Sequence, residues 1–539
     1  MSNTTAILSL LHEPADRCSA TRLFRGEPVL RWTLDRLARS RRLATTAVLC
    51  WEDQLPAVTP IAAEERAYVL AKGPRMSVPQ IEAIAAARRW ADGWRGGLLA
   101  ACDFDLGFYA PWHAELVERL NSTAVLLADA SAGLVDAQLV DALIEHAEAR
   151  PDLELCFAPA APGLCGALLR PTLLNRLAAA KAHPGRLMHY HPDQLSREPL
   201  AADSCLPVPA VIARTSHRFT LHCERQVLRL DDATVSLNGQ LLSTGAEELV
   251  CRMHAHKPPD RLPREVVLEL NTTRATKPIY WPGRTLKIDR PPFTSDLARA
   301  LFQEMSELDD TRLTLAGVGD PLLAPDVFTL IDAAKLEAGA AIHLETDLLE
   351  VNAQQIARLA ASPVDVVSVH LPALTPQTYM EVMGRDGYAA VIENIRRFVA
   401  ERQARGSMLP LLVPVFTKCQ ENLAEMEPWY DQWLRAVGNA VIRGPSDCAG
   451  QIPDVAVADM APPGRKPCAR LASRVTILSD GTIVSCEEDV LGAQMMGHIG
   501  KDSLQEVWQR RFERLREEHR QSQLTNRPLC RRCKEWHRP

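Results

Sequence analysis

Four cysteines near the carboxyl end constrain the fold of this chain more than any other feature. Cys468 is followed after twelve residues by Gly481 and after four more by Cys486, and two residues separate Cys530 from Cys533. The segment VTILSDGTIVSC predicts a β-hairpin with Asp-Gly at its turn, which folds the second cysteine back toward the first. The C-x-x-C spacing lets both remaining sulfurs face one metal site. The tail therefore predicts a small module built around one metal centre.

The spacing leaves the identity of the metal open. Four thiolates bind a zinc ion in a tetrahedral site, and they also bind an iron-sulfur cluster. A third interpretation, four buried cysteines without a metal, leaves the C-x-x-C pair unexplained among basic and polar residues. Cys448 precedes the four and is interpreted as a substitute ligand, a redox thiol or a packing residue. It and His537 lie outside the predicted ligand set.

The remaining nine cysteines are scattered among apolar neighbours. The start of the chain has no basic leader or cleavage site, and no run of about 18 apolar residues occurs. We therefore expect a cytoplasmic protein without a membrane span, whose thiols stay reduced. These cysteines should be small buried hydrophobic residues. They are Cys18, Cys50, Cys102, Cys156, Cys165, Cys205, Cys223, Cys251 and Cys419.

Size and charge restrict the classes of function. At 539 residues the chain is too long for one core, since a domain usually has about 100 to 200 residues. A net charge of -6 gives no overall basic field, so nucleic acid is not the expected partner. A protein or a small molecule of unknown identity is the expected partner.

The first 200 or so residues alternate short apolar runs with amphipathic segments, which predicts an α/β domain with a mostly parallel sheet. The strand candidates are TTAILSLL, TTAVLCW and STAVLLAD, and the helix candidates are PVLRWTLDRLARS and residues 78–94. Asp129 ends the third strand candidate, and a carboxylate there faces the ligand crevice of such a sheet.

Together with the segment RGEPVLRWTLDRL, Asp129 makes this region similar to the GT-A nucleotidyltransferases. In that family a GKPLL-like segment follows a glycine-rich nucleotide loop, and an aspartate after a strand holds the metal. Here HEPADRCSATRLF replaces the loop, without a glycine to bring backbone amides near a triphosphate. The resemblance implies metal-dependent nucleotide chemistry at Asp129 as one candidate function.

Residues 203–262 are predicted to be a connecting segment. The pieces FTLHCERQVLRL and ATVSLNGQLLS have the character of strands, with a hairpin expected at Asn238 and Gly239.

From Glu265 onward the alternation of strands and helices resumes. Six strands with crossover helices predict a partial (β/α)6 barrel. The strand candidates are VVLEL, TRLTL, AAIHLETDLLEV, VDVVSVHL, LPLLVPVF and NAVIRG.

The segment LAGVGDPLL after the second of these strands resembles the GGEP-type turn of the radical SAM barrel. The resemblance assigns Gly319, Asp320 and Pro321 to the amino group of S-adenosylmethionine. A glycine turn lets carbonyls approach an ammonium group, and an acidic side chain favours its charge. The alternative interpretation of Asp320 is a helix cap.

The cysteines of the radical SAM family are absent from this barrel. The family places three thiolates in a C-x-x-x-C-x-x-C loop after the first strand, where this chain has ELNTTRATKPIYWPG. Arg274, Pro278 and Trp281 stand at those positions, and none can ligate iron. We therefore expect a barrel that does not cleave S-adenosylmethionine in the conventional way. An atypical radical SAM enzyme with displaced ligands is the alternative.

The cysteine pattern of the tail resembles the SPASM domain, in which a GNI-like turn and a helix separate the two cysteine pairs. The matching residues between the pairs are Gly497, His498, Ile499, Leu504 and Trp508. The resemblance implies one [4Fe-4S] cluster, because longer SPASM domains continue with further cysteines and this chain ends at Pro539. The implied ligands are Cys468, Cys486, Cys530 and Cys533.

The expected architecture is α/β and resembles the spiro-SPASM proteins of the radical SAM superfamily. Its parts are a nucleotidyltransferase-like domain (1–202), a connecting segment (203–262), a radical SAM-like partial TIM barrel (263–455) and a SPASM module (456–539). The leading hypothesis is an iron-sulfur protein whose barrel is a scaffold or partner in a maturation or modification reaction. Whether the chain is itself an enzyme is left open.

Overall fold

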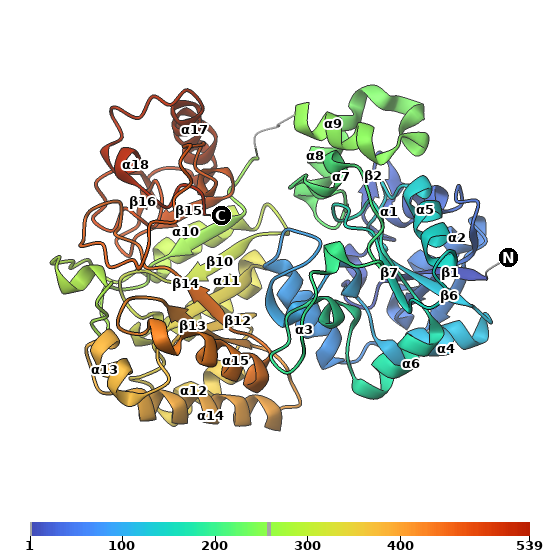
Figure 1. The fold of residues 1–539 in the computed structure, drawn as a ribbon. Coiled ribbons are helices and arrows are strands. Elements are labelled where there is room, and N and C mark those ends of the chain that lie inside the picture. Colours follow the sequence, from blue (N-terminus) through green and yellow to red (C-terminus); the bar gives the residue numbers. More distant parts are fainter. Residues whose placement is uncertain (1–2, 256–259, 539) are drawn as a thin grey trace. The chain divides into compact units, whose positions relative to one another are not determined.

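The computed structural model describes residues 3–255 and 260–538. The chain forms two compact units, Met1–Pro258 and Pro259–Pro539. Each unit contains its own large sheet and its own core (Figure 1). None of the helices in these ranges is both long and apolar enough to cross a membrane.

The N-terminal unit contains a six-stranded sheet in the order β5-β4-β1-β6-β8-β7. Its first four strands are parallel, and β8 runs antiparallel to both β6 and β7. The strands are β1 (Thr4–Ser9), β4 (Leu43–Cys50), β5 (Tyr68–Ala71), β6 (Ala124–Asp129), β7 (Leu155–Phe157) and β8 (Ala167–Leu169), beside the short pair β2 (Leu23–Phe24) and β3 (Glu27–Pro28). Every residue of β1 and β6 is buried, because helices cover both faces of the sheet. The predicted mostly parallel α/β arrangement is confirmed.

The helices of this unit include the two expected at residues 28–40 and 78–94. They are α1 (Val29–Leu37), α2 (Leu55–Glu64), α3 (Pro79–Arg89), α4 (Ala110–Arg119), α5 (Ala137–Glu148), α6 (Pro171–Ala180), α7 (Ala210–Ala213), α8 (Glu224–Thr234) and α9 (Ala246–Ala255).

The strands and the hairpin predicted between residues 203 and 262 are wrong. Residues Glu224–Thr234 form α8, and Val235–Ser243 form two short 3₁₀ helices that meet at a kink at Asn238, beside Gly239. The buried apolar residues recur every three to four positions, which is the spacing of one helical face. They are Val227, Leu230, Ala233, Leu237 and Leu241, and all belong to the core of the N-terminal unit.

The C-terminal unit contains a nine-stranded sheet in the order β14-β13-β12-β11-β10-β9-β15-β16-β17. Strands β9 to β14 are parallel and coincide with the six strand candidates, so that prediction is confirmed. These strands are β9 (Glu265–Leu268), β10 (Arg312–Leu315), β11 (Ala341–Thr346), β12 (Val366–His370), β13 (Leu411–Thr417) and β14 (Val441–Arg443).

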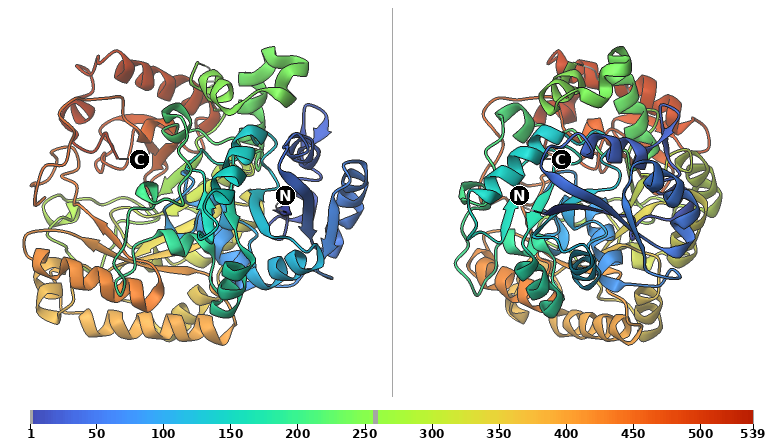
Figure 2. Two further views of the ribbon diagram at one scale, coloured as in Figure 1. Left: turned by 45° about the vertical axis from the view of Figure 1, so that its right-hand side comes forward. Right: turned by 90° about the vertical axis from the view of Figure 1, so that its right-hand side faces the viewer.

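Helices connect these strands and pack on the outer side of the sheet (Figures 1 and 2). Those of the barrel are α10 (Ser295–Met305), α11 (Val327–Ala338), α12 (Ala353–Ala360), α13 (Pro376–Met383), α14 (Tyr388–Ala404) and α15 (Met426–Val437). Those of the tail are α16 (Leu504–Glu506), α17 (Glu513–Arg520) and α18 (Pro528–Arg532), with a π-helix, Val507–Phe512, between the first two.

The tail hairpin continues the sheet of the barrel. Strand β15 (Arg474–Ile477) pairs in parallel with β9, and then β16 (Thr482–Val484) and β17 (Met495–His498) follow antiparallel. At the turn, Gly481 has a φ of +89° and its amide donates to the carbonyl of Leu478. The predicted hairpin is confirmed, whereas its attachment to the first strand of the barrel is a finding of the structure.

Asp136 connects two helices of the N-terminal unit and offers a test of their packing. Its carboxylate accepts hydrogen bonds from the amides of Gln138 in α5 and Ala246 in α9. We expect Asp136→Ala to lower the stability by about 1 to 3 kcal/mol, because it leaves both amides without this acceptor. Urea unfolding followed by circular dichroism should show a lower midpoint, while Asp152→Ala on the surface should not. An unchanged midpoint for Asp136→Ala would contradict this role.

Candidate metal centre

The four tail cysteines line one cavity. Cys486 follows strand β16, and Cys468 precedes a 3₁₀ helix at Arg470–Ala472. Cys530 lies in α18, and Cys533 follows the last residue of that helix. The hairpin and the short helix thus bring both predicted pairs to the same place.

The thiols interact with one another and with nearby carboxylates. Burial raises the pKa of Cys486 well above its ordinary value, and Glu488 raises that pKa further. Burial also raises the pKa of Cys530, with Cys468 as a second cause, and raises the pKa of Cys533 to about 12. Without a bound cation the site therefore favours neutral thiols, and metal binding would release protons.

Donors that the sequence did not reveal surround the sulfurs. The amide of Glu535 donates to Cys533 Sγ at 3.2 Å, and the Nε2 amide of Gln494 lies 4.0 Å from Cys530 Sγ. The guanidinium of Arg465 donates to the carbonyls of Cys530 and Cys533 and lines the same cavity. Hydrogen bonds to the sulfurs are one of the means by which proteins set the reduction potential of an iron-sulfur cluster.

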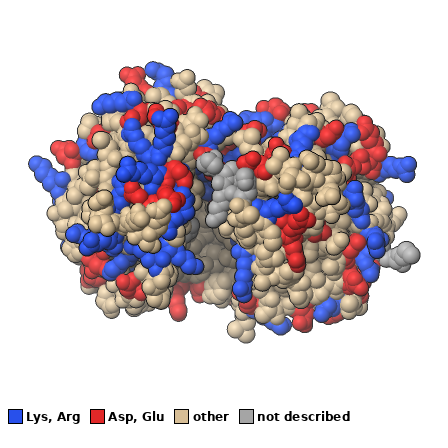
Figure 3. All heavy atoms as spheres, turned by 90° about the horizontal axis from the view of Figure 1, so that it is seen from above, with Lys and Arg blue, Asp and Glu red and all other residues tan. Residues whose placement is uncertain are grey.

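The last helices of the tail are basic. Residues 501–538 contain eleven Lys and Arg residues against six Asp and Glu residues, a difference of five positive charges. Figure 3 looks onto the side where α17 and α18 lie, and Lys and Arg side chains gather there on the C-terminal unit. The cavity wall itself carries Glu488 and Asp489 beside Arg465, so the excess of positive charge lies on the helices and not at the sulfurs.

The four thiols line one cavity, but within residues 3–255 and 260–538 no three His, Cys, Asp or Glu side chains converge closely enough to hold a single metal ion. Thiolates are the donors that both a zinc ion and an iron-sulfur cluster use.

The segment between the cysteine pairs adopts the expected turn and helix. His498 ends β17, the amide of Ile499 donates to the carbonyl of Gly481, and Leu504 begins α16. Trp508 is buried in the π-helix, where Arg516 lies 4.5 Å from its ring centroid. This packing holds the hairpin against the helices of the tail.

The remaining cysteines are free thiols, and most are buried as expected. Cys251 is exposed and Cys165 is half-buried, so the expectation is wrong for Cys251. Cys448 is buried and packs with Val318 and Ile452, although the neighbouring Ala449 lines the tail cavity. This environment favours the packing interpretation of Cys448.

The turn predicted to bind S-adenosylmethionine lies after β10. Asp320 is buried, and its carboxylate accepts hydrogen bonds from Thr346 Oγ1 and from the amides of Leu322 and Asp347. Gly319 lies against Asn271, where a Cβ would approach the carbonyl to 2.3 Å. Asp320 thus caps the 3₁₀ helix Pro321–Leu323. The assignment of this turn to the cofactor stays a prediction.

The loop after β9 contributes an arginine to the carboxyl ends of the barrel strands. Arg274 Nε donates to Asp347 Oδ2 at 2.9 Å, and its Nη2 lies 2.7 Å from His370 Nδ1. The same imidazole contacts Glu345 through Nε2 at 3.1 Å, and Arg443 Nη2 lies 2.9 Å from that nitrogen. A buried network of charged side chains therefore lies where active sites of such barrels are found.

The charges of this network hold one another ionised. Burial raises the pKa of Asp347, but Arg274 and His370 outweigh it and hold that pKa below the ordinary value. For Arg274, burial lowers the pKa and Asp347 more than compensates. The other two loop positions are also filled, since Pro278 is buried and Trp281 Nε1 donates to the carbonyl of Val318 at 2.8 Å. The sequence showed that these residues lack sulfur, but not what replaces it.

In the N-terminal unit Asp129 ends β6, as predicted. Its Oδ1 accepts hydrogen bonds from the amide and hydroxyl of Ser131, both at 2.8 Å, and burial raises its pKa. In the loop after β1, Glu13 accepts hydrogen bonds from the amide of Ser19 at 2.6 Å and from its hydroxyl. A carboxylate of the chain therefore occupies the backbone donor of Ser19.

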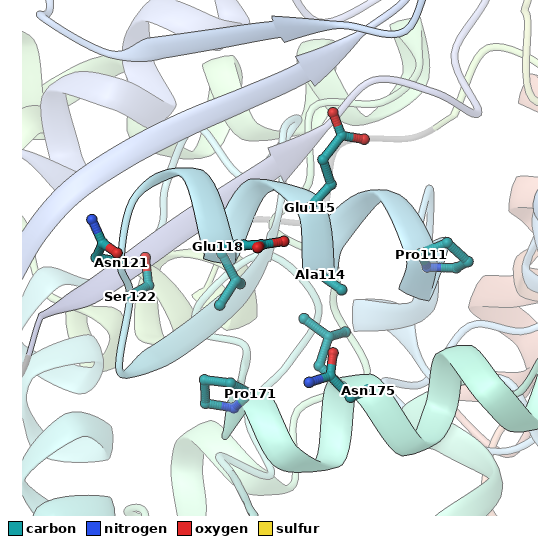
Figure 4. A pocket seen from close by; sticks show the side chains of 10 residues that line it. Pro111, Ala114, Glu115, Glu118, Asn121, Ser122, Pro171 and Asn175 are labelled. Atoms are coloured by element: carbon teal, nitrogen blue, oxygen red, sulfur yellow. The ribbon is translucent and has the colours of Figure 1, made fainter.

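A groove of 720 Å³ in the N-terminal unit lies between α4 and α6. Figure 4 shows Asn175 of α6 turned toward Ala114 of α4. The groove includes Ser122, just before β6, whereas Asp129 ends that strand. The two places are separated by roughly 17 Å of extended strand, so this groove is not the crevice at Asp129.

Two segments of the chain match known families. Residues 282–426 match the family described as the radical SAM superfamily, and residues 468–534 match the SPASM family, described as an iron-sulfur cluster-binding domain. The first match begins after Trp281, beyond the three positions where the cysteines of that superfamily are missing. The second match spans all four tail cysteines.

Individual proteins are similar at low identity. An uncharacterized protein of Treponema pallidum is 25% identical over 248 residues, which cover 43% of this chain and 67% of the relative. SuiB of Streptococcus suis, bound to the precursor peptide SuiA, is 14% identical with a TM-score of 0.39, covering 51% of this chain and 71% of SuiB. A cytidylyltransferase of Leptospira borgpetersenii is 12% identical with a TM-score of 0.34, covering 47% and 95%. From the two family matches, this chain carries a radical SAM superfamily domain followed by a SPASM iron-sulfur cluster-binding domain.

Proposed function

We propose that this protein binds one [4Fe-4S] cluster through Cys468, Cys486, Cys530 and Cys533, and that its barrel does not cleave S-adenosylmethionine in the conventional way. The barrel then acts as a scaffold or partner in a maturation or modification reaction. The observation that carries the proposal is the contrast between the two sites: four thiols line the tail cavity, and a buried ion-pair network fills the mouth of the barrel.

The tail cavity supports the cluster through its donor set. Its four thiols come from both ends of the SPASM match, and its sulfurs have nearby N–H donors in Glu535 and Gln494. A cluster bound there would supply one-electron chemistry. The chain would contribute the thiolates and the donors to sulfur.

The barrel supports the second half of the proposal. Reductive cleavage of S-adenosylmethionine in this superfamily depends on a cluster held by three thiolates, and the corresponding loop offers Arg274, Pro278 and Trp281. Arg274 is tied to Asp347, so a cluster at this place would have to displace a buried guanidinium and leave its carboxylate unpaired.

Two alternatives have less support. An atypical radical SAM enzyme needs a second cluster on ligands outside this loop, and the barrel offers only Cys419 and Cys448 as thiols. Metal-dependent nucleotide chemistry at Asp129 needs backbone amides for phosphate, and Glu13 occupies the amide of Ser19. Calorimetry with a nucleoside triphosphate and Mg²⁺ tests the second alternative directly.

Metal analysis of anaerobically purified protein tests the cluster. We expect about four iron and four sulfide per chain, with a paramagnetic resonance signal after reduction. Cys486→Ala should lose most of the iron, because the cluster loses one thiolate. The matched control is Cys419→Ala, which removes a buried thiol of the barrel and should keep the iron. Zinc at about one per chain without iron, or unchanged iron in Cys486→Ala, would refute the cluster.

Cleavage of S-adenosylmethionine tests the barrel. After reduction with dithionite in the presence of S-adenosylmethionine, we expect no 5'-deoxyadenosine above the level given by Cys486→Ala. The physical reason is that the loop after β9 has no thiolate to hold a second cluster. Product formation together with about eight iron atoms per chain would instead establish the atypical radical SAM enzyme.

The pair of Arg274 and Asp347 can be tested by its effect on stability. We expect Arg274→Met to cost about 3 to 5 kcal/mol, because it leaves a buried carboxylate without its guanidinium. Since the folded state lowers the pKa of Asp347, this contribution is fully present above about pH 4, the unfolded pKa, and is lost progressively as the pH falls from there toward the lower folded pKa. Urea unfolding at pH 7 and pH 3.5 measures both effects.

Two further variants make that measurement specific. Arg385→Met breaks an exposed pair with Glu350 and should cost about 1 kcal/mol or less. The double variant Arg274→Met, Asp347→Asn should be more stable than Arg274→Met alone. If the single and double variants unfold together, Arg274 and Asp347 do not act as a pair.

A further inference from the structure

A cavity of 320 Å³ at the carboxyl ends of β13 and β14 is lined by three basic side chains. Lys418 directly follows β13, Arg443 is the last residue of β14, and Arg538 comes from the tail. Among the described residues that line the cavity, none is acidic. Its volume lies at the lower end of the range of about 300 to 1,000 Å³ that is usual for small-molecule sites.

Backbone contacts fix the three cations at this place. The amide of Lys418 donates to the carbonyl of Arg443 at 2.8 Å, which ties the two strand ends together. Arg538 Nη1 donates to the carbonyl of Gly444 at 3.3 Å. A Cβ at Gly444 would lie 2.9 Å from Arg538 Nη2, so the glycine allows the guanidinium to approach. The cavity wall is therefore built from the barrel and the tail together.

The charges that line the cavity are not balanced. Arg443 pairs with Glu345 at 3.2 Å, and Arg538 pairs with Glu535 at 2.6 Å. Lys418 is half-buried, and none of the other described residues that line the cavity with it is acidic. Both guanidinium groups also have more N–H groups than their pairs use. An oxyanion in the cavity would balance Lys418 and accept those remaining hydrogens.

The rest of the cavity wall is apolar. It consists of Ile442, Pro445, Val457 and Met460, together with small residues between them. Met460 is 61% exposed and Val457 is 36% exposed, although both are large apolar residues. A ligand with an apolar body beside its anionic group would cover this surface and gain free energy from its burial.

We propose that this cavity binds the carboxylate or phosphate group of a small organic molecule. Lys418 is the principal contact with the oxyanion, Arg443 and Arg538 assist, and the apolar body lies against Val457 and Met460. The site is distinct from the turn at Gly319, because β14 and β13 are separated from β10 by two further strands. It does not depend on the metal of the tail.

Calorimetry at low ionic strength on the full-length protein as purified tests this proposal. The probes are inorganic phosphate, phenyl phosphate and benzoate. We expect phenyl phosphate to bind more tightly than inorganic phosphate because of the apolar wall. Lys418→Met should weaken binding of phenyl phosphate about tenfold or more, because it removes a charged hydrogen-bond donor. The matched control is Lys501→Met, an exposed lysine of the tail that is not part of the cavity and should leave affinity unchanged.

A second variant keeps the test valid if Lys418→Met folds poorly. Arg538→Gln removes a half-buried cation of the cavity and should also weaken the binding of phenyl phosphate, and circular dichroism checks the fold of both variants. Absence of binding of all three probes at millimolar concentration overturns the proposal, as does unchanged affinity in both variants. Competition of S-adenosylmethionine with phenyl phosphate also overturns it, because the cavity would then belong to the cofactor site.

Discussion

The pairing of β15 with β9 is the constraint on which the C-terminal unit depends. Four consecutive residues of the tail, Arg474 to Ile477, pair with Glu265 to Leu268 of the barrel. Arg474 also forms an ion pair with Glu265 at 3.1 Å, and Val475 and Ile477 belong to the same core as the barrel strands. The metal module is therefore an extension of the barrel sheet, and the position of Cys486 is fixed relative to the barrel.

The barrel and the tail of the C-terminal unit surround their candidate sites with different kinds of side chain. In the tail, four thiols lie in one cavity beside Arg465, Glu488 and Asp489. At the carboxyl ends of the barrel strands, buried and paired charges form a network of Arg274, Asp347, His370 and Glu345. The charge of a guanidinium that is paired with a carboxylate is compensated without any cofactor, whereas clustered thiols are stabilised as thiolates by a metal. This difference explains why the tail, and not the barrel, is the candidate redox site.

Local patterns in the sequence predicted much of this architecture. The six barrel strands and the tail hairpin follow from apolar alternation and from an Asp-Gly turn, and both were found. The region from Glu224 to Ser243 was wrongly assigned, because its short apolar pieces fit a strand as well as a helix until their burial is known. The strand pair β9 and β15 could not be predicted, since no local pattern connects residues about 200 positions apart.

The same difference between local patterns and long-range contacts applies to the candidate sites. The four cysteines were found from their spacing, and they line one cavity. Gln494 and Arg465 were missed, because a single amide or arginine has no distinctive pattern in a sequence. Arg274 was recognised only as a residue without sulfur, and its contacts with Asp347 and His370 depend on strands that converge in three dimensions.

The late position of β15 in the chain has a consequence for biosynthesis. Until the ribosome has produced Arg474 to Ile477, β9 is an unprotected edge of a parallel sheet, with its backbone donors and acceptors open to other chains. Contacts across such a sequence separation also form slowly. The nascent protein is therefore most exposed to aggregation in the interval between completion of its barrel and arrival of its last strands.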